Sequence, residues 1–292
     1  ISANGAGTVT LTAGGGTSTL TVSNPITSGS GAVQLTAVDG VTLNGANGDV
    51  TTTGTYTVNA DSNADGTGTY SQNNAGSAVS SGAVQITAAD VVLTGTINSG
   101  AANVTILTST AAATIGIEDA SKSLNLTDAE LDQVSSTGTI NIGSAANTGG
   151  ITIGTDAALT QGAKNFQFTT AGNIAISGNN FTTTGNVGLT ADNAGNTAAI
   201  TSGAGVVGAA ALTATADAGI ALNTSVTTLT ATNSTSGNIV IAEATGVDLA
   251  GLTQTTAGNI QVVTTNGSIT TSGAISANGA GTVTLTAGGG TS

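Results

Sequence analysis

Residues 1–18 read ISANGAGTVTLTAGGGTS, and residues 275–292 repeat the same eighteen residues without a mismatch. The offset between the two copies is 275 − 1 = 274 residues. An identity of this length inside one chain indicates a repeat architecture. A duplication of this one segment is the simpler interpretation. Because the copies occupy both ends of the sequence, we favour a tandem arrangement, in which residues 1–274 form one repeat and residues 275–292 begin the next.

The repeated segment contains VTLTA (9–13), in which apolar residues alternate with threonine. Alternation with a period of two predicts a strand that buries one face, and β-branched residues favour strands. Turn residues arrive every 8–12 residues or so, and no strand longer than about seven residues is expected. The same pattern recurs along the chain in STLTV (18–22), VQLTA (33–37), VQITA (84–88), TINIG (139–143), ITIGT (151–155), NIAIS (173–177) and NIVIA (238–242).

Weaker repeats lie inside the 274-residue repeat. Residues 26–45 resemble residues 78–95, with Val33 and Val84 in equivalent places. Nested repeats of this kind are typical of a solenoid that grew by successive duplication. A Gly-Asn-Ile or Gly-Asn-Val phrase also opens strand-like runs at 172–174, 185–187, 237–239 and 258–260.

The composition of the core favours a solenoid over a sandwich. The chain has only 3 Phe and 2 Tyr, and its inward positions are Val, Ile, Leu and Ala. A sandwich of this size would need bulky aromatic residues to fill a gap of about 10 Å between its sheets. A narrow β-helix suits small, uniform residues, and it lets Asn and Thr form ladders along its axis. We therefore predict an all-β chain that forms one continuous parallel β-solenoid over residues 1–292.

One acidic segment, IEDASKSLNLTDAELDQV (117–134), departs from the strand pattern. Thr127 and Glu130 have the spacing of a capping box, and Leu131 and Val134 lie one helical turn apart. The sequence therefore predicts one short helix near residues 127–134 on the flank of the solenoid. We favour an excursion that shields a coil over a binding patch.

The composition also excludes several classes of function. The chain has no Cys and no His, so thiolate and imidazole chemistry, zinc fingers and disulfides are excluded. Its net charge is -13, and Lys122 and Lys164 are its only basic side chains, which argues against nucleic-acid binding. No run of 18 apolar residues occurs, so no membrane span is expected. We expect neither a catalytic residue nor an enzyme.

A candidate metal site begins at Asp61 with DSNADGT, which matches the opening of a calcium loop, D-x-[DN]-x-[DN]-G. Ca²⁺ binds six to eight oxygen ligands, and Asp61, Asn63, Asp65 and the Thr67 carbonyl could supply four of them. The twelfth position is Gln72, where a calcium loop has a bidentate Glu. Ca²⁺ is the candidate cofactor, with a plain polar turn as the favoured alternative.

The segment SLNLTDAELDQVSSTGTINIG (123–143) resembles the LTDAELD…GTxxIG segment of large bacterial exoproteins of the filamentous-haemagglutinin type. The surrounding Gly-Asn-Ile and VTLTA phrases are similar to the β-helix repeats of that family. The resemblance implies a right-handed parallel β-helix, export through the outer membrane, and a role in adhesion, surface coats or fibres. It places the protein outside the cell, on a bacterial cell surface.

We therefore expect an extracellular fibre made of identical repeats joined head to tail, with neighbouring fibres or cell-surface glycans as further partners. The stalk of a secreted adhesin, with its binding tip outside this chain, is the main alternative. An ice-binding face is a second, suggested by TVTLT (8–12), TTT (51–53) and TTTG (182–185). A polysaccharide-active β-helix is a third, although it would need two facing carboxylates and the acids are mostly scattered singly.

Overall fold

The computed structural model of the chain describes residues 1–45, 48–73 and 78–289. It confirms the predicted fold class: among these residues nearly all regular structure is β, the strands are parallel and stacked as a β-solenoid, and there is one short helix. The internal contacts of the chain define two compact units. The expectation of one continuous solenoid over residues 1–292 stays a prediction. Unit 1 is Ile1–Gly116 with Ala120–Gly143, and unit 2 is Ile117–Asp119 with Ser144–Ser292.

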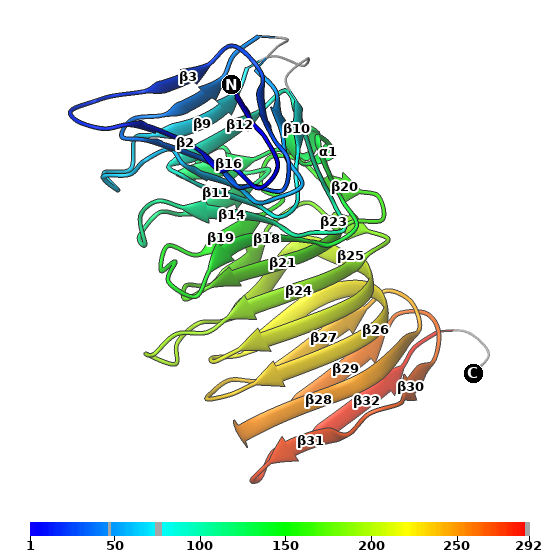
Figure 1. Cartoon of the computed structure of the whole chain (residues 1–292). Helices are drawn as coiled ribbons and strands as arrows, with labels where there is room; N and C mark the ends of the chain where they lie inside the picture. The colour runs from blue at the N-terminus through cyan, green and yellow to red at the C-terminus, as the bar shows by residue number, and fades with distance from the viewer. Residues whose placement is uncertain (46–47, 74–77, 290–292) are drawn as a thin grey trace. The chain divides into compact units, whose positions relative to one another are not determined.

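Unit 1 contains three parallel sheets, and each coil of the chain adds one strand to a sheet (Figure 1). The first sheet is β1 (Ser2–Ala3), β4 (Ile26–Ser28), β7 (Val50–Thr51), β10 (Ala78–Ser80), β13 (Thr96–Gly100) and β17 (Val134–Ser136). The second is β2 (Val9–Ala13), β5 (Val33–Ala37), β8 (Tyr56–Asn59), β11 (Val84–Ala88), β14 (Val104–Thr108) and β18 (Thr139–Ser144). The third is β3 (Leu20–Val22), β6 (Val41–Leu43), β9 (Thr69–Gln72) and β12 (Asp90–Leu93).

The register of unit 1 places apolar residues over apolar residues in successive coils. Val33 and Val84 both pair with Tyr56, so the two residues that the nested repeat aligns do lie in one inward column. The next inward column contains Leu35 and Ile86, and both side chains are fully buried. Two further short strands, β15 (Ile115–Ile117) and β16 (Leu124–Leu126), follow β14 in the chain.

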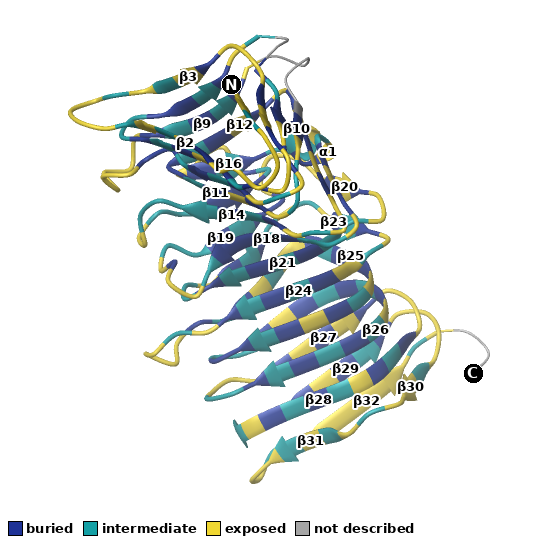
Figure 2. Cartoon of the chain, in the orientation of Figure 1, coloured by how far each residue is buried: buried dark blue, intermediate teal, exposed yellow. Residues whose placement is uncertain are grey.

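Unit 2 repeats the arrangement with three columns of parallel strands. Along most of these strands buried and accessible residues alternate, as Figure 2 shows for β24, whereas all five residues of β32 are exposed. The strands are β19 (Ile151–Ile153), β20 (Leu159–Gln161), β21 (Asn165–Thr170), β22 (Ile174–Ile176), β23 (Phe181–Thr183), β24 (Asn186–Ala191), β25 (Ile200–Ala216), β26 (Ile220–Asn233), β27 (Ile239–Glu243), β28 (Val247–Ala257), β29 (Ile260–Thr264), β30 (Ile269–Thr271), β31 (Ile275–Asn278) and β32 (Val283–Ala287).

Three strands of unit 2 are longer than predicted. β25 has 17 residues, β26 has 14 and β28 has 11, so the expected limit of about seven residues was wrong. The prediction treated small residues as strand breaks. In β25 they are corners instead: a Cβ on Gly205 would lie 2.4 Å from the carbonyl oxygen of Asn179. Glycine lets the backbone turn against the neighbouring coil, and the pairing of β25 with β26 shifts register there, between Thr201 and Val206.

The recurring Gly-Asn-Ile phrase forms an asparagine ladder at one corner of unit 2. Asn238 Oδ1 accepts a hydrogen bond from the backbone N–H of Asn259 at 2.8 Å. Asn259 Oδ1 accepts in turn from the N–H of Thr282 at 2.9 Å. Each asparagine thus binds a corner amide of the next coil, which satisfies a backbone donor that the strands do not reach.

The short helix is α1 (Asp128–Asp132), within the predicted range. Thr127 Oγ1 accepts from the N–H of Glu130 at 3.2 Å, and Glu130 Oε2 accepts from the N–H of Thr127 at 2.9 Å, which confirms the capping box. Glu130 Oε1 also accepts from the N–H of Leu93 at 3.1 Å, and Leu131 is fully buried. These contacts hold the helix against β12 within unit 1 and give it a structural role.

Candidate functional site

The predicted calcium loop lies in unit 1 between β8 and β9. Its first residue, Asp61, accepts hydrogen bonds from backbone N–H groups later in the loop. The Asp61 side chain is only 2% exposed. Its carboxylate accepts from the N–H of Asp65 at 3.2 Å and from the N–H of Gly66 at 2.8 Å. Ser109 Oγ donates a third hydrogen bond at 2.6 Å. The Asp61 carboxylate therefore ties the loop that follows β8 to the segment that follows β14, two strands further along the same sheet.

The other loop side chains form an exposed hydrogen-bonded group. Asn63 Nδ2 donates to Asp65 Oδ2 at 2.7 Å. Thr67 Oγ1 lies 2.6 Å from Asp65 Oδ1 and 2.9 Å from Asp39 Oδ1. The hydrogen bond from the Thr67 side chain, followed by that from Asn63, lowers the pKa of Asp65 below its usual value. Asp65 is thus an ionised, exposed carboxylate at the tip of the loop.

Gln72 is the one predicted ligand that the structure places elsewhere. It lies on β9, between Leu43 and Leu93 of the neighbouring strands, and its side chain is fully buried. Its Nε2 donates to the carbonyl of Thr96 at 3.3 Å, and its Oε1 is buried without a hydrogen-bond partner. The loop residues are therefore brought together without a twelfth-position ligand, and calcium binding there stays a prediction.

In unit 2, the buried carboxylate of Glu243 accepts hydrogen bonds from backbone N–H groups of the same unit. Glu243 is fully buried, and its Oε1 accepts from the N–H and the Oγ1 of Thr245 at 2.9 and 2.8 Å. Its Oε2 accepts from the N–H of Val226 at 3.2 Å. These bonds assign Glu243 a structural role at its corner. Across the residues that the structure describes, no three His, Cys, Asp or Glu side chains are close enough to hold a metal ion.

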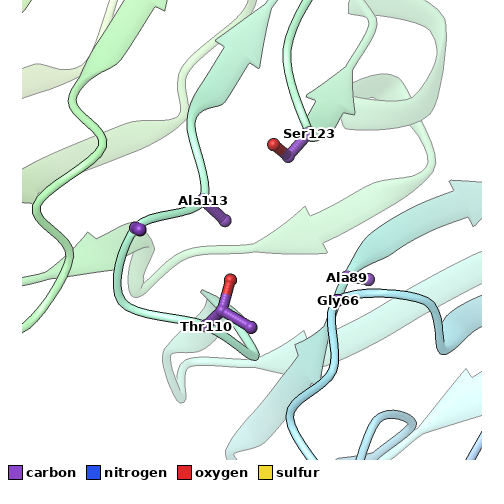
Figure 3. A pocket seen from close by; sticks show the side chains of 6 residues that line it. Gly66, Ala89, Thr110, Ala113 and Ser123 are labelled. Atoms are coloured by element: carbon purple, nitrogen blue, oxygen red, sulfur yellow. The ribbon is translucent and has the colours of Figure 1, made fainter.

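A small pocket opens on unit 1 beside the loop, and Figure 3 shows its lining. Its volume is about 240 Å³, below the usual range for small-molecule sites of about 300–1,000 Å³. The lining offers two hydroxyl groups and no charged or aromatic side chain, which gives a ligand little to bind. The lining residues are Gly66, Ala89, Thr110, Ala112, Ala113 and Ser123.

A threonine ladder on the outer face of unit 2 was missed at the level of sequence. Successive coils pair one outward threonine with the next, from β21 to β28: Thr169, Thr190, Thr215, Thr232 and Thr253. The number of residues between them varies, so no fixed interval reveals the ladder. A second outward column runs beside this ladder and contains Thr213 paired with Thr230. The next residues in that column are Gly188 on one side and Gly251 on the other, so the ladder is two threonines wide only at this pair.

The two copies of the repeated segment occupy opposite ends of their units. In unit 1, the N–H of Val9 donates to the carbonyl of Ala32 at 2.9 Å. In unit 2, the carbonyl of Thr282 accepts from the N–H of Ile260 at 2.9 Å. Val9 is 6% exposed, whereas its counterpart Val283 is 43% exposed. The last coil of unit 2 therefore presents an apolar interior that further packing could cover.

Comparison with known proteins found no matching family model, no matching curated protein and no matching solved structure. The resemblance of residues 123–143 to exoproteins of the filamentous-haemagglutinin type stays a prediction. Within the described part of the chain, no helix has the length and apolar character needed to cross a membrane. Function is therefore inferred from the geometry of the fold.

Proposed function

We propose that this chain is a structural protein, a section of an extracellular fibre on a bacterial surface built from tandem β-solenoid repeats. One observation supports this most directly. The side chains of Val283 and Leu285 are 43% and 39% exposed, although Ile260 and Val262, their partners in the preceding coil, are fully buried. A solenoid with an apolar end coil is suited to extension by further coils.

The proposed role is mechanical, and the fold supplies its physical basis. Stacked coils are spaced by about 4.8 Å, so each added coil lengthens a rod by that amount. Each coil contacts only its neighbours, so stability grows with the number of repeats. The net charge of -13 opposes lateral association between rods. The surface location and the adhesive surroundings rest on the resemblance stated above.

Imaging chains with one, two and three copies of residues 1–274, each followed by residues 275–292, tests the proposal. We expect rods of one width whose length rises linearly with the number of copies. Compact particles, or beads joined by bends at each junction, would contradict it. Native material provides a second test: long filaments support the fibre, whereas single rods of finite length with a distinct tip would favour the adhesin stalk.

A further inference from the structure

We infer that the repeated segment is a shared coil: residues 275–287 of one repeat serve at the same time as residues 1–13 of the next. This rests on the proposed function, because it assigns how tandem repeats join. The partner is a second copy of this sequence, whose residues 26–37 would pair with the open edge of β31 and β32. The chain shows each half of that junction separately, one in unit 1 and one in unit 2.

The backbone hydrogen bonds of the two halves are compatible. Thr8 and Val9 share a peptide bond, and their counterparts are Thr282 and Val283 (8 + 274 = 282). In unit 1 the N–H of that peptide binds the following coil, and in unit 2 its carbonyl binds the preceding coil. The N–H and C=O of one peptide in a strand point to opposite edges. A single coil can therefore make both bonds.

The turn that precedes the strand has the same conformation in both copies of the segment. Gly5 has φ 63° and its counterpart Gly279 has φ 67°. The N–H of Gly7 donates to the carbonyl three residues earlier at 3.2 Å, and the N–H of Gly281 does the same at 3.3 Å. The turn is therefore preserved whether the neighbouring coil lies on one edge or the other.

The interior columns continue across the junction. Val283 pairs with Ile260, and its counterpart Val9 pairs with Val33, which gives an aliphatic column of three coils. Ile260 and Val33 are fully buried, so the middle side chain would be enclosed from both sides. The neighbouring column would contain Val262, Leu285 and, from the following copy, Leu35.

The corner of the shared coil requires glycine on both sides. A Cβ on Gly281 would lie 2.1 Å from the carbonyl oxygen of Gly258 in the preceding coil. A Cβ on Gly31 would lie 2.0 Å from the carbonyl oxygen of Gly7, the counterpart of Gly281. Ser28 Oγ also donates to that carbonyl of Gly7 at 2.7 Å. At this corner the backbone of the segment can therefore approach the neighbouring coil closely on either side, because glycine leaves the necessary space.

A two-copy chain tests the shared coil, with residues 1–274 joined directly to a second copy of residues 1–292. A Thr284→Ser tag in the middle copy of the segment distinguishes its peptides by mass. We expect the amide of Val283 in the middle copy to exchange at least about 100-fold more slowly than in the one-copy chain, because it would bind Ala32 of the following copy. Equal exchange in the two chains would overturn the shared coil.

A substitution provides the second measurement. Leu285→Asp in the middle copy should abolish slow exchange in the coils on both sides, because it places a charge between buried Val262 and Leu35. The same change in the one-copy chain should cause only a local loss, and Thr284→Asp, on the outer face, is the matched control for both chains. An equally small effect of Leu285→Asp in the two chains would exclude the shared coil. If the two-copy chain still forms a rod of twice the length, the fibre function survives that result.

Discussion

Units 1 and 2 use the same alternating sequence pattern but connect their strands differently. In the described part of unit 1 the strands have at most six residues, and the coils are interrupted by the loop from Asp61 to Thr67 and by helix α1. In unit 2 the strands β25, β26 and β28 continue through corners, which contain Gly and Ala in β25 and β28 but no glycine in β26. The alternation therefore sets which side chains face inward, while the residues at the corners set where a strand ends.

The interiors of the two units also differ in their aromatic residues. Unit 1 buries Tyr56 and Tyr70, with ring centroids 6.5 Å apart and hydroxyl groups 3.3 Å apart, and burial raises the pKa of both. Unit 2 buries Phe166, Phe168 and Phe181 as an apolar trio. The five aromatic residues of the chain thus gather into one cluster in each unit, where they fill wider parts of an interior that is otherwise aliphatic.

The largest expected difference between the units comes from the phenylalanine trio. Phe181 makes edge contacts with the other two rings at centroid distances of 5.4 and 5.5 Å. Phe181→Ala should lower the free energy of unfolding by about 3–5 kcal/mol, because it opens a cavity. Hydrogen exchange should show the loss in unit 2 first. The exposed Thr160→Ala is the control, and a loss below about 1 kcal/mol at Phe181 would contradict this packing.

Removing an asparagine of the ladder should lower stability equally in the two units, because both contain the same hydrogen bond from a threonine N–H to an asparagine Oδ1. Asn103 Oδ1 accepts from the N–H of Thr139 in unit 1, and Asn259 Oδ1 accepts from the N–H of Thr282 in unit 2, each at 2.9 Å. Asn103→Ala and Asn259→Ala should each cost roughly 0.5–1.5 kcal/mol in chemical denaturation. A large effect at only one of these positions would show that the ladder is not a common stabilising element.

Within unit 1, two carboxylates should give opposite dependences of stability on pH. Burial raises the pKa of Asp90 above 3.8, despite a hydrogen bond from the N–H of Asn125, so its contribution is present at low pH and is lost as pH rises through the raised value. The pKa of Asp65 is lowered, so its contribution is present above 3.8 and is lost as pH falls.

Melting curves of two variants check these signs. Relative to the unsubstituted chain, Asp90→Asn should gain stability as pH rises above 3.8, because the pKa of Asp90 is raised. Asp65→Asn should lose stability as pH rises towards 3.8, because the pKa of Asp65 is lowered, and the difference should stay constant above about pH 5. Because Asp65 is exposed, its effect should be the smaller and should shrink further at high salt. Parallel curves for the two variants would refute the assignment.

Removal of calcium should have the smallest effect on the melting temperature of the chain. If Ca²⁺ binds the loop, a chelator should lower the melting temperature of the chain but leave the Asp65→Asn variant unchanged, because the variant lacks one of the ligand charges. Mg²⁺ at the same concentration is the control for ionic strength. An unchanged melt in the chelator would leave the loop as a turn held by the Asp61 carboxylate.

Much of the fold could be predicted from local patterns. The alternation around Val33 and Val84 gave the correct inward residues, and the spacing of Thr127 and Glu130 gave the helix. The strand lengths in unit 2 could not be predicted, because the same small residues occur in turns and in corners that continue a strand, as in β26, which contains no glycine. The burial of Gln72 on β9 could not be predicted either, because the start of β9 decides which residues point inward.

The sequence by itself determined the strand alternation, the capping box and the eighteen-residue identity, because these depend on neighbouring residues or on comparison within the chain. Only the tertiary structure decided which coils are adjacent. The stacking of the coils created the threonine ladder, placed Asp61 against Ser109, and left Val283 exposed while burying the identical Val9. Coil lengths vary along the chain, so the contacts between coils arise from parallel backbone pairing and cannot be read from any constant spacing of residues.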